Sequence, residues 1–436
     1  MASYRFKIVI AFLTLFLAAG SLSAKVLTLE DCIQLAIKNS ADLVRARGQV
    51  RVADGLVWQA FGAFLPGISA SGSVNQINSE PGQRVIQDQI FQSSGLTKSY
   101  NLGASANLTI FNGGQNIFNY LGAKTDKSYY EYTAEQTEQS LVLSVKTTYF
   151  AYLAALKLKQ AGEEAVKRSE EQLKLATSKY EIGSASKSDV LKAQVQYGKD
   201  KLFLLDTDNG IRTSRADLAY LIGADVNSDV DFSQEYERKD YSGTEEEALK
   251  FGLAHYPGLL AGEKNLQAAK YDLRSTKGRY LPTVSFGVGR SWSNEFWSNV
   301  SKFRRQDARW SFGTSIDIPI FDNFSRKAAL SRSKVNLNNA RADYSYLLNN
   351  LALQIKKAYL EINKAEEALK VAEENEAAAK EDMSLVREKY SLGAATMLEV
   401  LDAEVSLITA QNSKIQSEFD FNMAVAKLEN AMGMRE

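Results

Sequence analysis

The chain contains the same pattern twice, and this duplication constrains its fold more than any other feature. Residues 179–183 (KYEIG) match residues 389–393 (KYSLG) at an offset of 210 positions. The Leu-Pro pairs at Pro66 and Pro282 keep the same order at an offset of 216. Ordered matches at a nearly fixed offset are typical of an internal repeat. We therefore expect two copies of one structural unit.

Each copy opens with a helical pattern, in which apolar residues recur at spacings of three and four. It covers about residues 28–64 in the first copy and 244–280 in the second. A Leu-Pro pair closes both segments, and the residue before a proline avoids the helical region. Two strand-like runs follow in each copy, with a polar loop between them.

A very long helix comes next in each copy, at about 115–180 and 325–390. A turn at Gly183 or Gly393 leads to a final helix that ends near Gly223 or Gly433. At 1.5 Å per residue, two helices of about 37 residues stacked end to end match one of about 66. Sequences rich in Ala, Glu, Lys, Gln and Leu suit rods that pack along narrow seams. The predicted helices therefore form long antiparallel coiled coils.

The N-terminus indicates export. Arg5 and Lys7 precede an apolar run at 8–19, and small residues follow at 20–24. This is the pattern of a secretory signal peptide, which we place at 1–23. The run is shorter than the roughly 20 residues that a spanning helix needs. We expect no later stretch to be apolar enough for a transmembrane helix, so strands would have to cross any membrane.

Composition excludes several classes of function. The 52 basic and 52 acidic residues give no net charge, whereas a nucleic-acid partner needs a concentrated basic face. His255 and Cys32 are the single residues of their types, so the chain has no zinc cluster and no internal disulfide. The sequence has no Ser-His-Asp arrangement, phosphate-binding loop or Cys-x-x-Cys pair. We therefore expect no enzyme activity, no metal and no cofactor.

The strand-like runs can face lipid. Apolar and polar residues alternate at 102–110 and 310–320, and more weakly at 68–77 and 283–290. Runs of about ten residues with this period are typical of transmembrane β-barrels, although a soluble hairpin with one buried face shows it too. A membrane-interface girdle is predicted from aromatic residues near the far ends of the strands, namely Tyr100, Trp292, Phe296, Trp297 and Trp310.

Four strands cannot close a barrel, since the smallest outer-membrane barrels have about eight. An open edge in lipid would leave backbone groups unpaired, each at a cost of several kcal/mol. The barrel must therefore be shared between chains. Two chains would give about eight strands filled by side chains, and three would give about twelve with a lumen. The residues alone leave the number open.

Several motifs resemble the TolC-like outer membrane efflux protein family. They are residues 27–31 (LTLED), the Leu-Pro pair before a strand, residues 110–114 (IFNGG) and the two Tyr-x-Ile/Leu-Gly turns. The resemblance implies an α+β fold, with a long antiparallel α-helical coiled-coil barrel joined to a shared transmembrane β-barrel. A homotrimer would supply twelve strands, four from each chain, and a twelve-helix tunnel through the periplasm.

The resemblance also implies a function and partners. Family members are passive exit ducts in the bacterial outer membrane, used in tripartite efflux or type I secretion. They dock to a periplasmic adaptor (membrane fusion) protein and, indirectly, to an inner-membrane pump of RND, ABC or MFS type. A periplasmic coiled-coil structural or adaptor protein is the alternative. It would have rods or one helical hairpin without the doubled strand pairs.

The domain boundaries follow the duplication. Repeat 1 covers 24–223, and repeat 2 covers 244–436. The segment at 224–243 would link the repeats and, by the resemblance, help to form a belt around the tunnel.

The resemblance places a periplasmic gate at the two turns. The residues concerned are Gly183, Ser184 and Asp189 in the first copy, and Tyr390, Gly393, Glu399 and Asp402 in the second. It implies that Asp189 bonds to Tyr390 while Glu399 and Asp402 line the pore. Ala395 stands where the family has a basic partner, so this part of the latch is missing.

A purely local explanation exists for most of these positions. Gly183 and Gly393 suit helix C-caps. Residues 186–189 and 396–399 have capping-box spacing, so Asp189 and Glu399 can serve to start helices. The two roles are compatible. Asp402 has no capping explanation, which makes it the stronger gate candidate.

Overall fold

The computed structural model describes residues 26–78, 83–86, 89–92, 96–227, 230–236 and 241–434. The expected signal peptide at 1–23 lies outside the described residues. The chain forms two compact units. We call the one made of residues up to Ala46, Ala134–Pro257 and Leu348–Glu436 the helical unit. The sheet unit is made of Arg47–Thr133 and Gly258–Leu347, so each unit draws on both copies of the repeat.

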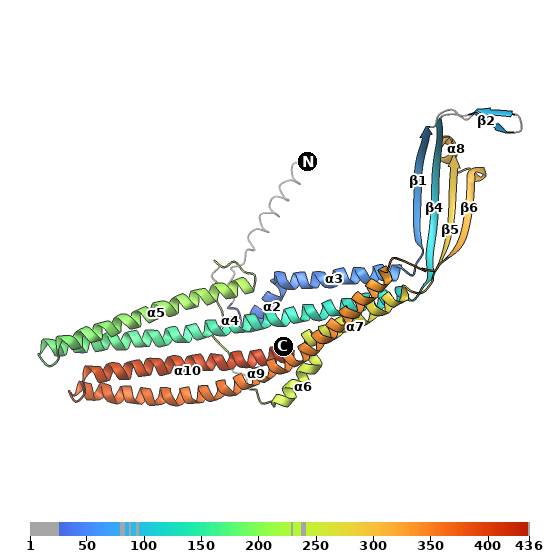
Figure 1. Ribbon diagram of the computed structural model, residues 1–436. Coiled ribbons are helices and arrows are strands. Elements are labelled where there is room, and N and C mark those ends of the chain that lie inside the picture. Colours follow the sequence, from blue (N-terminus) through green and yellow to red (C-terminus); the bar gives the residue numbers. More distant parts are fainter. Residues whose placement is uncertain are drawn as a thin grey trace, which may run out of the picture. The chain divides into compact units, whose positions relative to one another are not determined.

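Two helical hairpins dominate the helical unit (Figure 1). Helix α4 (Gln115–Glu181) turns into α5 (Lys187–Leu221), and α9 (Ser325–Ser391) turns into α10 (Met397–Met432). Both long helices begin at the predicted residue and end one residue later than predicted. The shorter helices α2 (Leu29–Asn39) and α6 (Glu245–His255) complete the unit.

A four-stranded antiparallel sheet dominates the sheet unit, in the order β1-β4-β5-β6 (Figure 1). Its strands are β1 (Gly67–Asn78), β4 (Leu96–Asn112), β5 (Thr283–Asn294) and β6 (Ala308–Asp317). Helices α3 (Ala41–Gly62) and α7 (Pro257–Gly278) precede the strand pairs. Strand β6 ends earlier than the predicted 320, because Pro319 has no N–H for a ladder.

The predicted polar loops contain short elements that the sequence analysis missed. A separate hairpin of β2 (Gln83–Ile86) and β3 (Gln89–Gln92) lies between β1 and β4. Between β5 and β6 lie the short helix α8 (Trp297–Val300) and the 3-10 turn η1 (Arg305–Asp307).

The prediction of one continuous helix at the start of each copy is wrong. The first breaks at Ser40, whose N–H still bonds the Ala36 carbonyl at 2.8 Å while its ψ of 122° leaves the helix. The second breaks at Tyr256, because Pro257 forces the preceding residue into an extended conformation. The helices after these breaks also end two residues earlier than predicted, at Gly62 and Gly278.

Register gives the sheet one apolar and one polar face, since cross-strand partners share a face. The apolar face holds Ile68, Ala70, Val74, Leu102, Ala104, Ala106, Leu108, Val284, Phe286, Val288, Trp310, Phe312 and Ile316. The polar face holds Ser69, Ser71, Ser73, Asn75, Asn101, Ser105, Asn107, Ser285, Ser291, Ser293, Arg309, Ser311 and Ser315. Side chains bond across the polar face, as in the 2.7 Å contact from Ser293 Oγ to Asn101 Oδ1.

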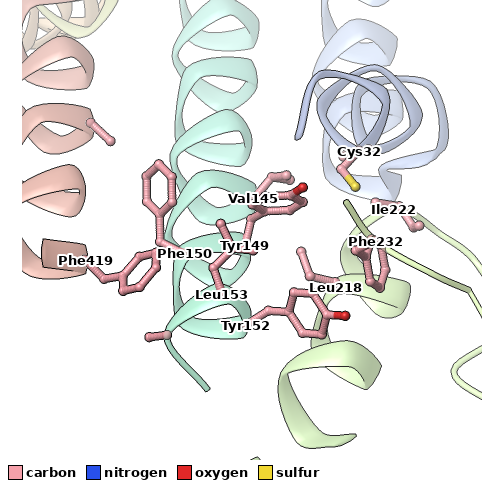
Figure 2. Close-up of a cluster of buried hydrophobic side chains, with 13 residues drawn as sticks. Cys32, Val145, Tyr149, Phe150, Tyr152, Leu153, Leu218, Ile222, Phe232 and Phe419 are labelled. Atoms are coloured by element: carbon pink, nitrogen blue, oxygen red, sulfur yellow. The ribbon is translucent and has the colours of Figure 1, made fainter. Parts of the chain in front are cut away.

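The core of the helical unit joins α4 to the linker between the repeats. Tyr149, Tyr152 and Leu153 of α4 are buried with Cys32 of α2 and Phe232 of the linker (Figure 2). The Tyr149 hydroxyl donates to the Ser233 carbonyl at 2.7 Å, and the Phe232 and Tyr152 rings meet edge to face at 5.5 Å. Burial raises the pKa of the Cys32 thiol to about 12, so this thiol stays protonated.

Helix α4 corrects one expectation about the membrane. Among the described residues it is the one helix that is long and apolar enough to cross a bilayer. The apolar side chains of Val145, Tyr149 and Phe150 are buried in the core of the helical unit. Of the most apolar stretch of α4, 33% is buried in this way, so packing within the unit accounts for part of the apolarity of the helix.

Candidate functional site at the two turns

Both turns are helix C-caps of the same type. Gly183 and Gly393 have φ values of 77° and 80°. The N–H after each glycine reaches back five residues, from Ser184 to the Lys179 carbonyl and from Ala394 to the Lys389 carbonyl, both at 2.8 Å. This is the Schellman motif, in which a left-handed residue closes a helix. Local backbone chemistry thus explains both glycines and the position of Ser184.

Asp189 caps its own helix. Its Oδ2 accepts hydrogen bonds from the Ser186 N–H at 3.0 Å and from Ser186 Oγ at 2.8 Å, and Ser186 Oγ accepts from the Asp189 N–H. These bonds from Ser186 hold the pKa of the Asp189 carboxyl below its usual value. No hydrogen bond joins it to Tyr390 within the described chain, so the implied Asp189–Tyr390 bond is absent and the capping interpretation holds.

At the second turn, only half of the capping box forms. Thr396 Oγ accepts from the Glu399 N–H at 3.3 Å, but the Glu399 carboxylate does not return to the cap. Glu399 and Asp402 are both exposed on α10. Within the described chain, neither carboxylate has a hydrogen bond or an ion pair. Both are thus available to face a solvent-filled passage.

Lys179 connects the two hairpins, and the sequence analysis missed it. Its Nζ donates to the Tyr390 carbonyl at 2.6 Å and lies 4.4 Å from the centroid of the Tyr390 ring. Tyr390 is buried, and this burial, with the charge of Asp189, raises the pKa of its hydroxyl. A cation near the last carbonyls of a helix is favourable. The sequence signal was a lysine in a last helical turn, but nothing in it showed that the acceptor lies 211 residues away.

A second missed contact supports the same pair of hairpins. Arg387 of α9 donates to Glu171 of α4 at 2.6 Å, and the bond lowers the pKa of the Glu171 carboxyl. Both side chains are 46% exposed, so the pair contributes little to stability by itself.

A buried polar cluster lies between α4, α5 and α10, farther along the hairpins from the two turns. Glu404 is fully buried and Asp200 is 4% exposed. Gln196 Nε2 donates to Asp200 Oδ1 at 2.9 Å. Within the described chain, both Glu404 oxygens, Asp200 Oδ2, and Nε and Nη2 of Arg168 lack a hydrogen-bond partner. Buried polar groups are normally paired, so this cluster is costly.

The cluster raises the pKa of the Glu404 carboxyl. Burial raises the pKa of the Glu404 carboxyl to about 7, the charge of Asp200 adds to this, and Arg168 and Arg387 oppose it. Burial also raises the pKa of Asp200. A signal was present in the sequence, since Glu404 occupies a core position between Val400 and Leu407 at the spacing of an apolar seam.

The five predicted girdle aromatics lie at the strand ends farthest from the helices of the sheet unit. Tyr100 of β4 packs against Trp297 of α8, with ring centroids 5.9 Å apart. Trp292 of β5 meets Phe303 at 5.0 Å. Trp310 lies on the apolar face of β6, two residues after the strand begins, and Phe296 is the exposed N-cap of α8. The structure brings these residues to one end of the sheet, while their role at a membrane interface stays a prediction.

Comparisons with known proteins agree on one family. The family model described as "Outer membrane efflux protein" matches residues 32–224 and 252–434. The outer membrane efflux protein BepC of Brucella suis is 24% identical over 93% of this chain and 85% of its own length. The probable efflux pump outer membrane protein TtgC of Pseudomonas putida is 23% identical over 93% and 82%. The crystal structure of VceC from Vibrio cholerae has a TM-score of 0.85 at 17% identity, covering 93% of this chain and 96% of that one.

Proposed function

The chain belongs to the outer membrane efflux protein family, and from that premise we propose that three copies form an exit duct with a gate at the two turns. It is a channel of the bacterial outer membrane, and members of this family work with periplasmic adaptor proteins and inner-membrane pumps. The trimer of this chain, its partners and its gate residues are our proposal.

The observation that carries the proposal is the two-faced sheet. An apolar face suits lipid and a polar face suits a water-filled lumen, which is the arrangement of outer-membrane barrels. The sheet order leaves β1 and β6 at its two edges. Open edges in lipid leave unpaired backbone groups, so β6 of one copy would pair with β1 of the next. Three copies give about twelve strands and an open lumen.

The helical hairpins would continue the lumen below the barrel. The linker segment around Phe232 is packed against α4 and suits the expected belt. Strands crossing the outer membrane and helices in the periplasm suit a chain whose relatives BepC and TtgC are outer membrane efflux proteins. Those names favour tripartite efflux over type I secretion. An adaptor docked to a pump of RND, ABC or MFS type would supply the energy.

The gate would be a ring of carboxylates closed by contacts between hairpins. Three copies of Glu399 and Asp402 place exposed, unpaired negative charges around one opening. Such rings favour cations. Lys179 would hold neighbouring turns together through Tyr390. Because Ala395 replaces the basic partner of the family latch, closure depends on this backbone contact rather than on an ion pair with Asp189.

The test is ion conductance across planar lipid bilayers, with the mass of the detergent-purified protein measured in parallel. Channels from a species of three chains are the expected result. Asp402→Asn should lower the preference for cations and raise single-channel conductance. Asp206→Asn, which changes an exposed carboxylate of α5 far from the turns, is the matched control and should leave both unchanged. A water-soluble monomer without conductance would favour the periplasmic rod or adaptor alternative.

A further inference from the structure

A charged residue lies on the apolar face of the sheet. Arg290 of β5 pairs with Ala104 of β4 on one side and with Trp310 of β6 on the other. Its neighbours on the same face of β5 are Val288 and Trp292, because side chains alternate along a strand. On the lipid face of a barrel, an arginine costs about 2–4 kcal/mol at the midplane and about 0–1 kcal/mol near the interface. The energetic cost of Arg290 therefore depends on its depth in the membrane.

The depth follows from its place in β5. The strand begins at Thr283, shortly after helix α7 ends. At about 3.3 Å per residue, Arg290 lies about 23 Å along the strand, or about 18 Å along the membrane normal after a tilt of about 40°. The apolar band of such barrels is about 25 Å tall. Arg290 thus lies in the half of the band away from the helices, at the level of its cross-strand partner Trp310.

Two aromatic rings pack on the guanidinium group of Arg290. Its guanidinium carbon lies 4.8 Å from the Trp292 ring centroid and 5.0 Å from that of Trp310. Within the described chain it has no ion pair. The strands that flank β5 are β4, which has no Asp or Glu, and β6, whose one carboxylate is Asp317 at its last residue. Its neighbours on this face, Ala104, Trp310, Val288 and Trp292, carry no carboxylate. Asp307, just before β6, bonds the Asn294 side chain, and its other oxygen is buried without a partner in the described chain.

Two buried donors at this place also lack acceptors. Nε of Arg290 and Nε1 of Trp292 have no hydrogen-bond partner in the described chain. Two indole rings pack on the guanidinium and its Nε is buried, so the two terminal nitrogens are the ones left for an external planar acceptor. At the same end of the sheet, the connection between β5 and β6 carries exposed Lys302, Arg304 and Arg305. These features together suit an acceptor with several negative oxygens.

We propose that the terminal guanidinium nitrogens of Arg290, held in place by Trp292 and Trp310, bind the phosphate group of a lipid in the outer leaflet of the outer membrane. The proposal rests on the proposed function, since only a membrane-embedded barrel exposes this face to lipid. Arginine binds phosphate through paired, charge-assisted hydrogen bonds. From this level, its long side chain extends toward the headgroups. The trimer would carry three such sites.

The experiment measures lipids retained by the trimer. Purified protein is incubated in detergent micelles with equal amounts of phosphatidylcholine and phosphatidic acid, and native mass spectrometry counts the lipids bound to three chains. We expect up to three phosphatidic acid molecules on the wild type. Arg290→Gln should lower this preference about tenfold, the loss expected for a charge-assisted hydrogen-bond pair. Arg290→Lys keeps the charge without the fork and should fall between the two.

The control is Arg309→Gln, on the neighbouring strand but on the polar face, opposite Ser291. It should bind phosphatidic acid like the wild type. Equal retention by Arg290→Gln and the wild type would overturn the proposal, and so would an equal loss in Arg309→Gln. Full displacement by 10-fold excess inorganic phosphate would assign the site to free phosphate instead of lipid. Conductance of each variant is measured alongside. A wild type that neither trimerises nor conducts would overturn the proposed function, whereas conducting trimers without the lipid preference would overturn only this inference.

Discussion

The buried carboxyl of Glu404 makes the folded chain sensitive to pH, and Glu404→Gln should remove that sensitivity. Glu404 is fully buried and has no hydrogen-bond partner among the described residues. It lies close to Asp200 on α5, Arg168 of α4 and Arg387 of α9, whose charges act on its pKa. Glutamine has nearly the same shape as a protonated glutamate but cannot ionise. The substitution therefore changes the charge and little else.

The magnitude follows from the two pKa values of Glu404. A pKa of about 7 in the folded chain, against 4.5 in the unfolded chain, corresponds to about 3 kcal/mol of stability. Because the folded state holds the proton more tightly, this stability is fully present below about pH 4.5. It is lost as pH rises through about 7, and no further change follows above that. Glu404→Gln should thus match the wild type at pH 4.5 and exceed it by up to about 3 kcal/mol at pH 8.

Thermal unfolding followed by circular dichroism between pH 4.5 and 8.5 tests this expectation. The melting temperatures of the wild type and Glu404→Gln should separate by a few °C as pH rises. Glu399→Gln lies on the same helix but is exposed, so its profile should follow the wild type. Parallel profiles for the wild type and Glu404→Gln across the whole range would refute the reasoning. They would mean that the carboxyl finds a partner in the assembled channel.

Two further expectations concern the turns. Asp189→Ala removes a capping box and should lower stability by about 1 kcal/mol at pH 7, as measured by thermal unfolding. Because the pKa of Asp189 is lowered in the folded chain, this difference should vanish as pH falls well below 4, and a constant difference would contradict the capping role. Lys179→Met removes the contact to the Tyr390 carbonyl and should raise single-channel conductance in planar bilayers. Lys174→Met, which breaks only a surface pair with Glu170, is the control, and equal effects of the two would exclude a specific contact.

The sequence predicted the order of the elements because the duplication allowed each copy to check the other. The long helices, the strand pairs and the two faces of the sheet all follow from periodicity. The breaks at Ser40 and Tyr256 were missed for different reasons. Pro257 gave a local signal at the second, whereas Ser40 lies in a sequence that is helical on both sides and breaks with no proline or glycine beside it.

The sequence predicted the positions of the turns better than the contacts that the residues at and near the turns make. Asp189 had two compatible roles, and the nearby Ser186 hydroxyl and N–H hold its carboxylate. Lys179 and Glu404 were missed because their importance depends on partners from other helices. A periodic pattern shows that position 404 is buried, but it does not show that Asp200 and Arg168 face the same space.

The repeat symmetry also predicts a contact between neighbouring chains. Lys179 contacts the Tyr390 carbonyl within one chain, and 210 positions separate Lys389 from Lys179 and Tyr390 from Tyr180. If the hairpins of repeat 1 and repeat 2 alternate around the ring of three chains, Lys389 should therefore reach the Tyr180 carbonyl of the neighbouring chain. That carbonyl accepts from the Gly183 N–H, just as Tyr390 accepts from Gly393.

Cysteines at positions 389 and 180 test this contact, since Cys32 is buried and does not compete. A short bismaleimide should link Lys389→Cys with Tyr180→Cys between chains, giving covalent trimers on a denaturing gel. Lys179→Cys with Tyr390→Cys should link within one chain and run as a monomer. If the first pair also ran only as a monomer, the two hairpins would not alternate around the opening. The closed gate would then need a different geometry from the one that the repeat implies.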